Sequence, residues 1–246
     1  AITALAVTAL VRTGTSADSP MVLRGVQYLL TFQQSDGGIY QRESAIANYE
    51  TSIAILALHE CNTSGRYDEI IQKAKRFLTV IQWDESEGNT CADPEYGGAG
   101  YGRHERPDLS NTAFLIDALK GVGASSDDPA IQRALIFVSR SQNLEGIHNT
   151  LEVANKNPDG GFYYTPANGG ESQAGTTPNG GLRSYGSMTY SGLRSMIYAG
   201  VSAKDPRVVA ATKWLGRHYT FAENPGMGDA GLYYYFHTAA KALHVL

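Results

Sequence analysis

Ala74-Lys75-Arg76-Phe77-Leu78 is one of four copies of a short string in which a small residue is followed, three positions later, by an aromatic and an aliphatic residue. The other copies are Gly25-Val26-Gln27-Tyr28-Leu29, Ala134-Leu135-Ile136-Phe137-Val138 and Ala211-Thr212-Lys213-Trp214-Leu215. A second string begins with threonine and is rich in small and aliphatic residues; it recurs in step with the first, at Thr3, Thr51, Thr112, Thr189 and Thr238. Two unrelated strings that keep step along a chain indicate a repeat of two elements.

Both elements are predicted to be helices. From Tyr67 onward, apolar residues recur every three to four positions with charged residues between them, which predicts a helix with one solvent-facing side. The threonine-led elements are apolar nearly all round, as expected of helices enclosed by others. Asp128-Pro129 and Asp205-Pro206, with Asp18-Ser19-Pro20 as a variant, are typical of helix starts. Five inner and four outer helices predict an all-α protein, an α/α toroid of repeated helical hairpins that forms one domain over residues 1–246.

Composition excludes several other classes of protein. The chain has 246 residues, of which 42% are hydrophobic and 18% charged, so it can bury a large core. A net charge of -4 with interspersed signs gives no basic surface for nucleic acid or an anionic membrane. No apolar stretch is long enough to span a bilayer, so we expect a soluble protein. Cys61 and Cys91 are expected to be free thiols, and no cofactor motif is present. Because the chain starts at Ala1 and ends within a helical pattern, we expect it to be a piece of a longer protein.

The strings extend into a longer pattern after each outer helix, with Gln33 and Gly37, Gln82 and Gly88, and Gln142 and Gly146. This pattern resembles the repeat of squalene and oxidosqualene cyclases, a superfamily that includes protein prenyltransferase β-subunits. In those cyclases the repeat ends in Gln, Gly and Trp, and here Ile39 and His148 take the place of two of the tryptophans. The resemblance implies an apolar, isoprenoid-type ligand in a central cavity. Since its relatives close the ring with six hairpin pairs, it also implies an open or incomplete ring. We interpret the three glutamines as bonding to backbone groups at helix ends, not as catalysts.

The stretch Arg106-Pro107-Asp108-Leu109-Ser110-Asn111-Thr112 bears on catalysis. In squalene-hopene cyclases the matching stretch resembles Asp, any residue, Asp, Asp and Thr, and its second Asp is the general acid. Asp108 matches the first Asp, Ser110 stands in place of the acid, and Asn111 replaces the third. A serine hydroxyl cannot protonate an alkene, so the usual acid is replaced. Asp108 and His104 remain as candidate acid-base residues, and the alternative is that Asp108 and Ser110 cap the following helix.

Protein prenyltransferases give a second comparison. The stretch from Leu232 to Thr238 resembles their Tyr-His-Thr sequence, in which the histidine is a zinc ligand, and this makes His237 a third candidate catalytic residue. The earlier stretch, from Ser184 to Met188, offers neither carboxylate nor thiolate, so no metal site is predicted. Aromatic faces stabilise carbocations and suit apolar ligands. With polar neighbours included, the candidate substrate-binding residues are Tyr49, Tyr101, Ser110, Asn111, Tyr185 and Tyr234.

Three functions fit these observations. The first is a terpene-cyclase-like or prenyltransferase-like protein that binds an apolar small molecule or lipid. The second is a non-catalytic toroid that binds a lipid or a protein. The third is a carbohydrate-active α/α barrel, which needs two carboxylates facing one cleft; Asp108 with Glu50 or Asp159 are the candidates.

Overall fold

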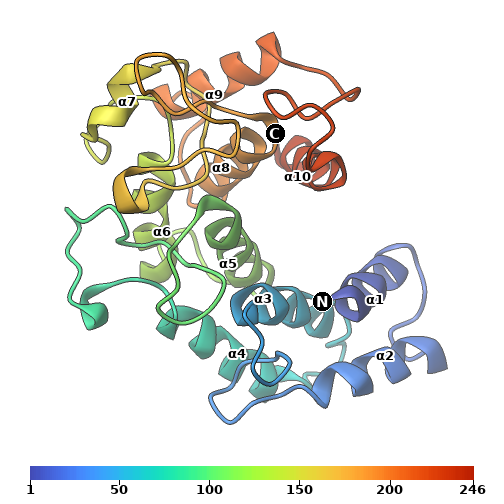
Figure 1. The fold of residues 1–246 in the computed structure, drawn as a ribbon. Helices are drawn as coiled ribbons and strands as arrows, with labels where there is room; N and C mark the ends of the chain where they lie inside the picture. Colours follow the sequence, from blue (N-terminus) through green and yellow to red (C-terminus); the bar gives the residue numbers. More distant parts are fainter. The chain divides into compact units, whose positions relative to one another are not determined.

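The computed structural model of the protein describes all residues from 1 to 246, and its regular elements are helices (Figure 1). Two short 3-10 turns, η1 (Glu85–Glu87) and η2 (Ala167–Gly169), and a few isolated β-bridges complete the secondary structure. The α-helices are α1 (Ile2–Arg12), α2 (Pro20–Leu30), α3 (Ala47–Glu60), α4 (Asp68–Val80), α5 (Leu109–Gly121), α6 (Pro129–Arg140), α7 (Glu152–Lys156), α8 (Gly186–Tyr198), α9 (Pro206–Arg217) and α10 (Leu232–Val245).

All nine predicted helices are present. The threonine-led strings lie in α1, α3, α5, α8 and α10, and the strings with an aromatic lie in α2, α4, α6 and α9. Sequence analysis missed α7, because a helix of five residues is too short to show a period. The predicted all-α fold class is confirmed, and the helical hairpins are consistent with part of an α/α toroid.

Three outer helices begin at a proline, as predicted. The Asp128 and Asp205 carboxylates accept the backbone N–H groups of Ala130 and Arg207 at 3.0 and 2.9 Å. At α2 the cap is the hydroxyl of Ser19, which accepts the N–H of Val22 at 3.4 Å. Each cap satisfies a donor that the first turn of a helix leaves unpaired.

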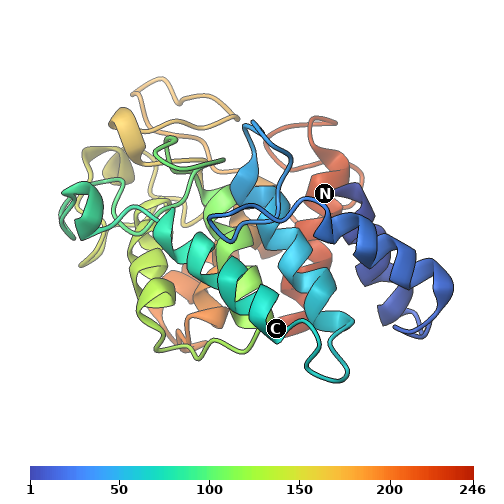
Figure 2. The same cartoon turned by 90° about the horizontal axis from the view of Figure 1, so that it is seen from below.

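The chain forms two compact units. The first unit contains residues Ala1–Gln82, Ala99–Glu105 and Phe114–Ser125, and the second contains Trp83–Gly98, Arg106–Ala113 and Ser126–Leu246. In the first unit, α1 packs on α2 and α3, and α3 packs on α4 (Figure 1). In the second, α8 packs on α6, α9 and α10 (Figure 2). α8 is buried over nearly its whole length, as an inner helix should be. The single domain and the open ring stay predictions.

The outer helices α4, α6 and α9 each lie against a glycine pair in the turn that precedes their hairpin. Gly37, Gly97 and Gly160 have φ values of +93°, +83° and +86°, which favour glycine. Each lies against the backbone of the next outer helix. A Cβ at Gly97 would be 1.9 Å from the carbonyl oxygen of Arg133, and one at Gly37 would be 2.7 Å from that of Lys73. The second glycine of each pair lies against the aromatic residue of the repeated string. Gly38, Gly98 and Gly161 lie next to Phe77, Phe137 and Trp214, respectively.

This turn corrects the glycine assignments of the second and third copies. The residues that close those turns are Gly97-Gly98 and Gly160-Gly161, not Gly88 and Gly146. Gln142 forms a β-bridge with Phe162, so Phe162 and not His148 stands where the cyclase repeat has tryptophan. The assignment failed because inserted segments separate the outer helix from its glycine pair. Ile39, which bridges to Gln33, was placed correctly.

The leading threonine of the inner helices bonds to the same turn. Thr51 Oγ1 accepts the N–H of Ile39 at 3.0 Å, and Thr189 Oγ1 accepts that of Phe162 at 3.1 Å. Gln142 Nε2 donates to the carbonyls of Gly160 and Arg207, both at 2.9 Å, which is the structural role predicted for it. In the first copy it is Gln34 that makes bonds of this kind. The third turn is therefore bonded to both helices of the hairpin that follows it.

None of the helices has the length and apolar character needed to cross a membrane. Cys61 is buried and Cys91 is exposed, and both are free.

The close approach at Gly97 gives a test of the turn. We expect Gly97→Ala to lower the free energy of unfolding by roughly 3–4 kcal/mol, because the methyl group overlaps the Arg133 carbonyl. Gly175→Ala is the matched control in the same unit, with φ +77° and nothing within 4 Å of the added Cβ; it should cost about 1–2 kcal/mol. Urea unfolding measures both values, and equal losses would contradict the role given to the turn.

Candidate functional site

Asp108 is a buried carboxyl at the start of α5, with a 1% exposed side chain. Its two oxygens accept the backbone N–H and the side-chain Nδ2–H of Asn111, both at 2.8 Å. The hydroxyl of Tyr164 donates to the same carboxyl. Burial raises the pKa of Asp108, and these hydrogen bonds offset part of that rise because they favour the charged form. Asp108 thus caps α5, as one alternative predicted, and is also a carboxyl that holds its proton to a higher pH than usual.

Ser110 has a different partner and does not cap the helix. Its Oγ lies 2.7 Å from the hydroxyl oxygen of Tyr234 on α10. Both residues are half-buried, whereas Asp108, two residues before Ser110, is buried. Burial raises the pKa of Tyr234, while the hydrogen bond with Ser110 and the positive charge of Arg194 act in the opposite direction. The pair therefore stays neutral and can donate and accept hydrogen bonds at neutral pH.

The loop around Tyr164 is fixed to the residues around Asp108. Tyr164 accepts the backbone N–H of Leu109 at 2.8 Å through its carbonyl, and the Thr165 hydroxyl donates to the carbonyl of Pro107 at 2.7 Å. Arg106 lies with its guanidinium carbon 5.9 Å from the centre of the Tyr164 ring and pairs with Glu171 at 2.5 Å. These contacts hold the Tyr164 hydroxyl at Asp108.

The structure brings four of the predicted residues into one cluster within the second unit, namely Asp108, Ser110, Asn111 and Tyr234. His237 lies on α10 three residues after Tyr234, which places both on one side of that helix, and it is half-buried. Tyr185 is buried at the start of α8, where its N–H donates to the carbonyl of Phe162 at 3.2 Å.

The remaining predicted residues belong to the first unit. Tyr49 packs edge-on against Phe114 with ring centres 4.7 Å apart, and burial raises the pKa of its hydroxyl. The carbonyl of Tyr101 accepts the N–H of Asn48 at 2.9 Å, and its side chain is 45% exposed. His104 is exposed and has a φ of +60°. Tyr49 and Tyr101 therefore lie at the first turn of α3, and His104 lies in the loop that follows Tyr101.

Sequence reasoning missed two members of the cluster. Tyr164 follows the glycine pair Gly160-Gly161 closely, and nothing in its local sequence links it to Asp108. Arg194 is 2% exposed in the otherwise uncharged helix α8, and its charge acts on the Tyr234 hydroxyl. A single cation within an inner helix was the signal that could have identified it, because a buried charge needs a compensating environment.

Asp159, a candidate for a carbohydrate-type carboxylate pair, lies in a separate network. Its carboxylate accepts bonds from the Ser184 hydroxyl at 2.6 Å, the Gly161 N–H at 2.9 Å and the Trp214 indole at 3.1 Å. It holds the third glycine turn to α9. Glu50 accepts the N–H of Gln41 in the first unit. No three His, Cys, Asp or Glu side chains gather as a metal site would require.

Comparison with known proteins agrees with the helical repeat. Residues 1–164 match the model of the squalene-hopene cyclase C-terminal domain. A squalene-hopene cyclase of Zymomonas mobilis is 27% identical over 148 residues, which are 59% of this chain and 22% of that protein. The chain therefore spans about a fifth of the length of that relative. With its helical hairpins, its glycine turns and this match, the chain belongs to the squalene-hopene cyclase family.

Proposed function

We propose that this protein binds an apolar, isoprenoid-type ligand at the cluster of Asp108, Ser110, Tyr164 and Tyr234, and that Asp108 supplies the proton of a cyclase-like reaction. The observation that carries the proposal is the state of Asp108. Burial raises its pKa, so that a carboxylic acid is available in a site of low polarity. Ser110, at the position of the family's usual acid, has no proton acidic enough for this step.

The neighbours of Asp108 support this role. The hydroxyls of Ser110 and Tyr234 are half-buried beside it and can bind an oxygen atom of a ligand. The rings of Tyr164 and Tyr234 provide aromatic faces, which stabilise positive charge. An acid with a raised pKa donates more readily to an oxygen lone pair than to a carbon-carbon double bond. We therefore expect an oxygenated isoprenoid, such as an epoxide, to react in preference to a hydrocarbon.

In this scheme the proton of Asp108 passes to the epoxide oxygen. The bond from that oxygen to carbon breaks as the π electrons of the neighbouring alkene attack the carbon. The resulting carbocation ends the sequence by losing a proton to solvent water. Asp108 is then returned to its acid form by a proton from solvent.

A second candidate function follows from the other role of Asp108. Because its carboxyl accepts bonds from Asn111 and Tyr164 and caps α5, the residue also has purely structural work. A protein that binds the same ligand without changing it would use the same cluster. Turnover distinguishes the two functions, since a binding protein retains the lipid unchanged.

The catalytic proposal is tested by incubating the protein with squalene, the epoxide of squalene and a prenyl diphosphate, with products identified by gas chromatography and mass spectrometry. We expect cyclised product from the epoxide, and a rate lower by a factor of about 10² or more in Asp108→Asn, the range typical of general acids. Tyr234→Phe should also lower the rate, whereas Tyr233→Phe, at an 88% exposed neighbour on the same helix, should not. Lipid retained without product would favour the binding protein. The absence of both retained lipid and product would refute both functions.

The protonation of Asp108 has a thermodynamic test as well. The pKa of Asp108 is raised on folding, so the group makes its full contribution to the free energy of unfolding below the unfolded-state pKa of about 3.9. That contribution is lost as the pH rises through the folded-state pKa. Asp108→Asn lacks this loss. We therefore expect the unfolding free energy of Asp108→Asn, relative to wild type, to increase as the pH is raised from about 4 and then to level off.

Urea unfolding across this pH range measures the difference. Asp229→Asn, at an exposed position of the same unit, is the control for introducing an amide. A difference that decreases with pH would show that the carboxyl is charged in the folded protein, which contradicts its role as an acid.

A further inference from the structure

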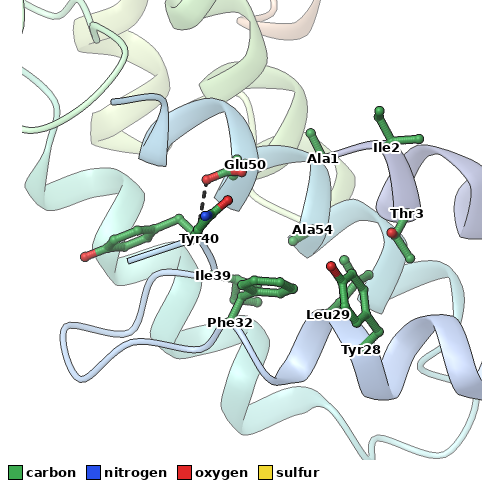
Figure 3. Close-up of a pocket in the computed structure, with 11 residues that line it drawn as sticks. Ala1, Ile2, Thr3, Tyr28, Leu29, Phe32, Ile39, Tyr40, Glu50 and Ala54 are labelled. Carbon is green, nitrogen blue, oxygen red and sulfur yellow. Dashed lines mark hydrogen bonds between the residues drawn. The ribbon is translucent and has the colours of Figure 1, made fainter. Parts of the chain in front are cut away.

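A pocket of about 420 Å³ lies between α1, α2 and α3 in the first unit (Figure 3). Thr3 of α1, Tyr28 and Phe32 of α2, and Ala54 of α3 line it, together with Ile39 from the turn between α2 and α3. At its edge the carboxylate of Glu50 accepts the N–H of Gln41 at 3.1 Å, the bond drawn as a dashed line in Figure 3. Its walls combine apolar side chains with polar groups, and its residues occupy defined positions in the repeat.

Tyr28 is the aromatic of the first copy of the repeat and corresponds to Phe77, Phe137 and Trp214. The three later aromatics are 5%, 0% and 3% exposed, and each lies against the second glycine of a turn. Tyr28 is 55% exposed, although the helix that carries it packs like the others. The surface that the later copies cover with a glycine turn is thus open at Tyr28.

Thr3 shows the same difference. The corresponding Thr51 and Thr189 are buried and accept the N–H of the residue after a glycine pair, at 3.0 and 3.1 Å. Thr3 is half-buried, and its hydroxyl does not accept the N–H of such a turn. Its hydroxyl lines the pocket beside Tyr28, so the acceptor and the aromatic of the repeat are both directed to the same space.

The second hairpin shows what fits such a space. There the segment Gly37-Gly38-Ile39-Tyr40 lies on α4 and on the start of α3. Gly37 approaches the helix backbone, Ile39 is 2% exposed and donates to Thr51, and the Tyr40 ring stacks on Phe77 with ring centres 5.3 Å apart. The third turn has the same sequence type, Gly160-Gly161-Phe162-Tyr163. The surface formed by the outer-helix aromatic and the inner-helix threonine thus binds a turn of two glycines, an apolar residue and a tyrosine.

We propose that the pocket at Thr3 and Tyr28 binds a Gly-Gly-apolar-aromatic turn of a further helical hairpin on the N-terminal side of α1. The order follows from the chain itself, because each turn precedes the threonine that binds it, as Ile39 precedes Thr51. The contact continues an interface that already occurs between the first turn and α4 and between the third turn and α9. It is independent of the ligand proposed for the Asp108 cluster.

The proposal is tested by supplying the turn at the natural spacing. Ile39 and Thr51 are 12 residues apart, and a copy of residues 31–48 fused directly before Ala1 places the second Ile39 12 residues before Thr3. The fused segment has a high effective concentration at the pocket, so a weak contact is detected. We expect the fusion to raise the Tm by roughly 3 °C or more and to protect Tyr28 from chemical iodination.

Matched variants separate this contact from a nonspecific effect. Thr3→Val should remove part of the gain in Tm and Tyr28→Ala should remove all of it, whereas Met21→Ala, a 52% exposed position on α2 outside the pocket, should leave it unchanged. Alanine in place of both glycines of the fused copy should abolish the gain. A fusion with no gain in Tm overturns the proposal. So does a concentration-dependent dimer of the unfused chain that Tyr28→Ala dissolves, because the occupant would then be a second copy.

Discussion

The approach of a glycine to the backbone of the next outer helix is the contact on which the repeat depends. At Gly97 even a methyl group would overlap the carbonyl of Arg133, and the positive φ of the same residue already favours glycine. With the first glycine in place, the second lies against the aromatic of the outer helix, and the following N–H reaches the threonine of the inner helix. One turn therefore fixes the position of two helices. This explains why the string of the outer helices and the string of the inner helices recur in step along the sequence.

The candidate site depends on the third of these turns. Beyond Gly160-Gly161 the chain continues as Phe162, Tyr163 and Tyr164. Phe162 is bonded to Thr189 on α8, and the Tyr163 hydroxyl donates to the carbonyl of Arg140. Tyr164 follows, its carbonyl accepts the N–H of Leu109, and its hydroxyl donates to Asp108. The same turn that anchors α9 thus positions one of the hydrogen bonds that offset the rise in the pKa of Asp108 caused by burial.

The helices could be predicted from the sequence because their signals are local. The apolar period of α4, the Asp-Pro starts of α6 and α9, and the two strings all lie within a few residues of what they specify. The glycine pairs of the second and third turns could not be assigned, because the inserted residues place Gly88 and Gly146 at the expected distance by coincidence. The pairing of Ser110 with Tyr234 joins residues that are 124 positions apart. Nothing local in the sequence marks such a contact, and so Ser110 was given a capping alternative that its geometry does not fulfil.

The inserted segments are closed at their base by the same pair of backbone bonds. Gln34, Trp83 and Asn143 each donate an N–H to the second glycine of their turn, at 2.8, 2.9 and 2.8 Å, and each accepts one from a residue of the glycine pair. Only residues 35–36 lie within the first closure, whereas residues 84–96 and 144–159 lie within the other two. The geometry of this pair of backbone bonds does not depend on the length of the segment that it closes. Lineages of this protein can therefore lengthen or exchange these segments without moving a helix, and a designer can graft a foreign loop at the same three places.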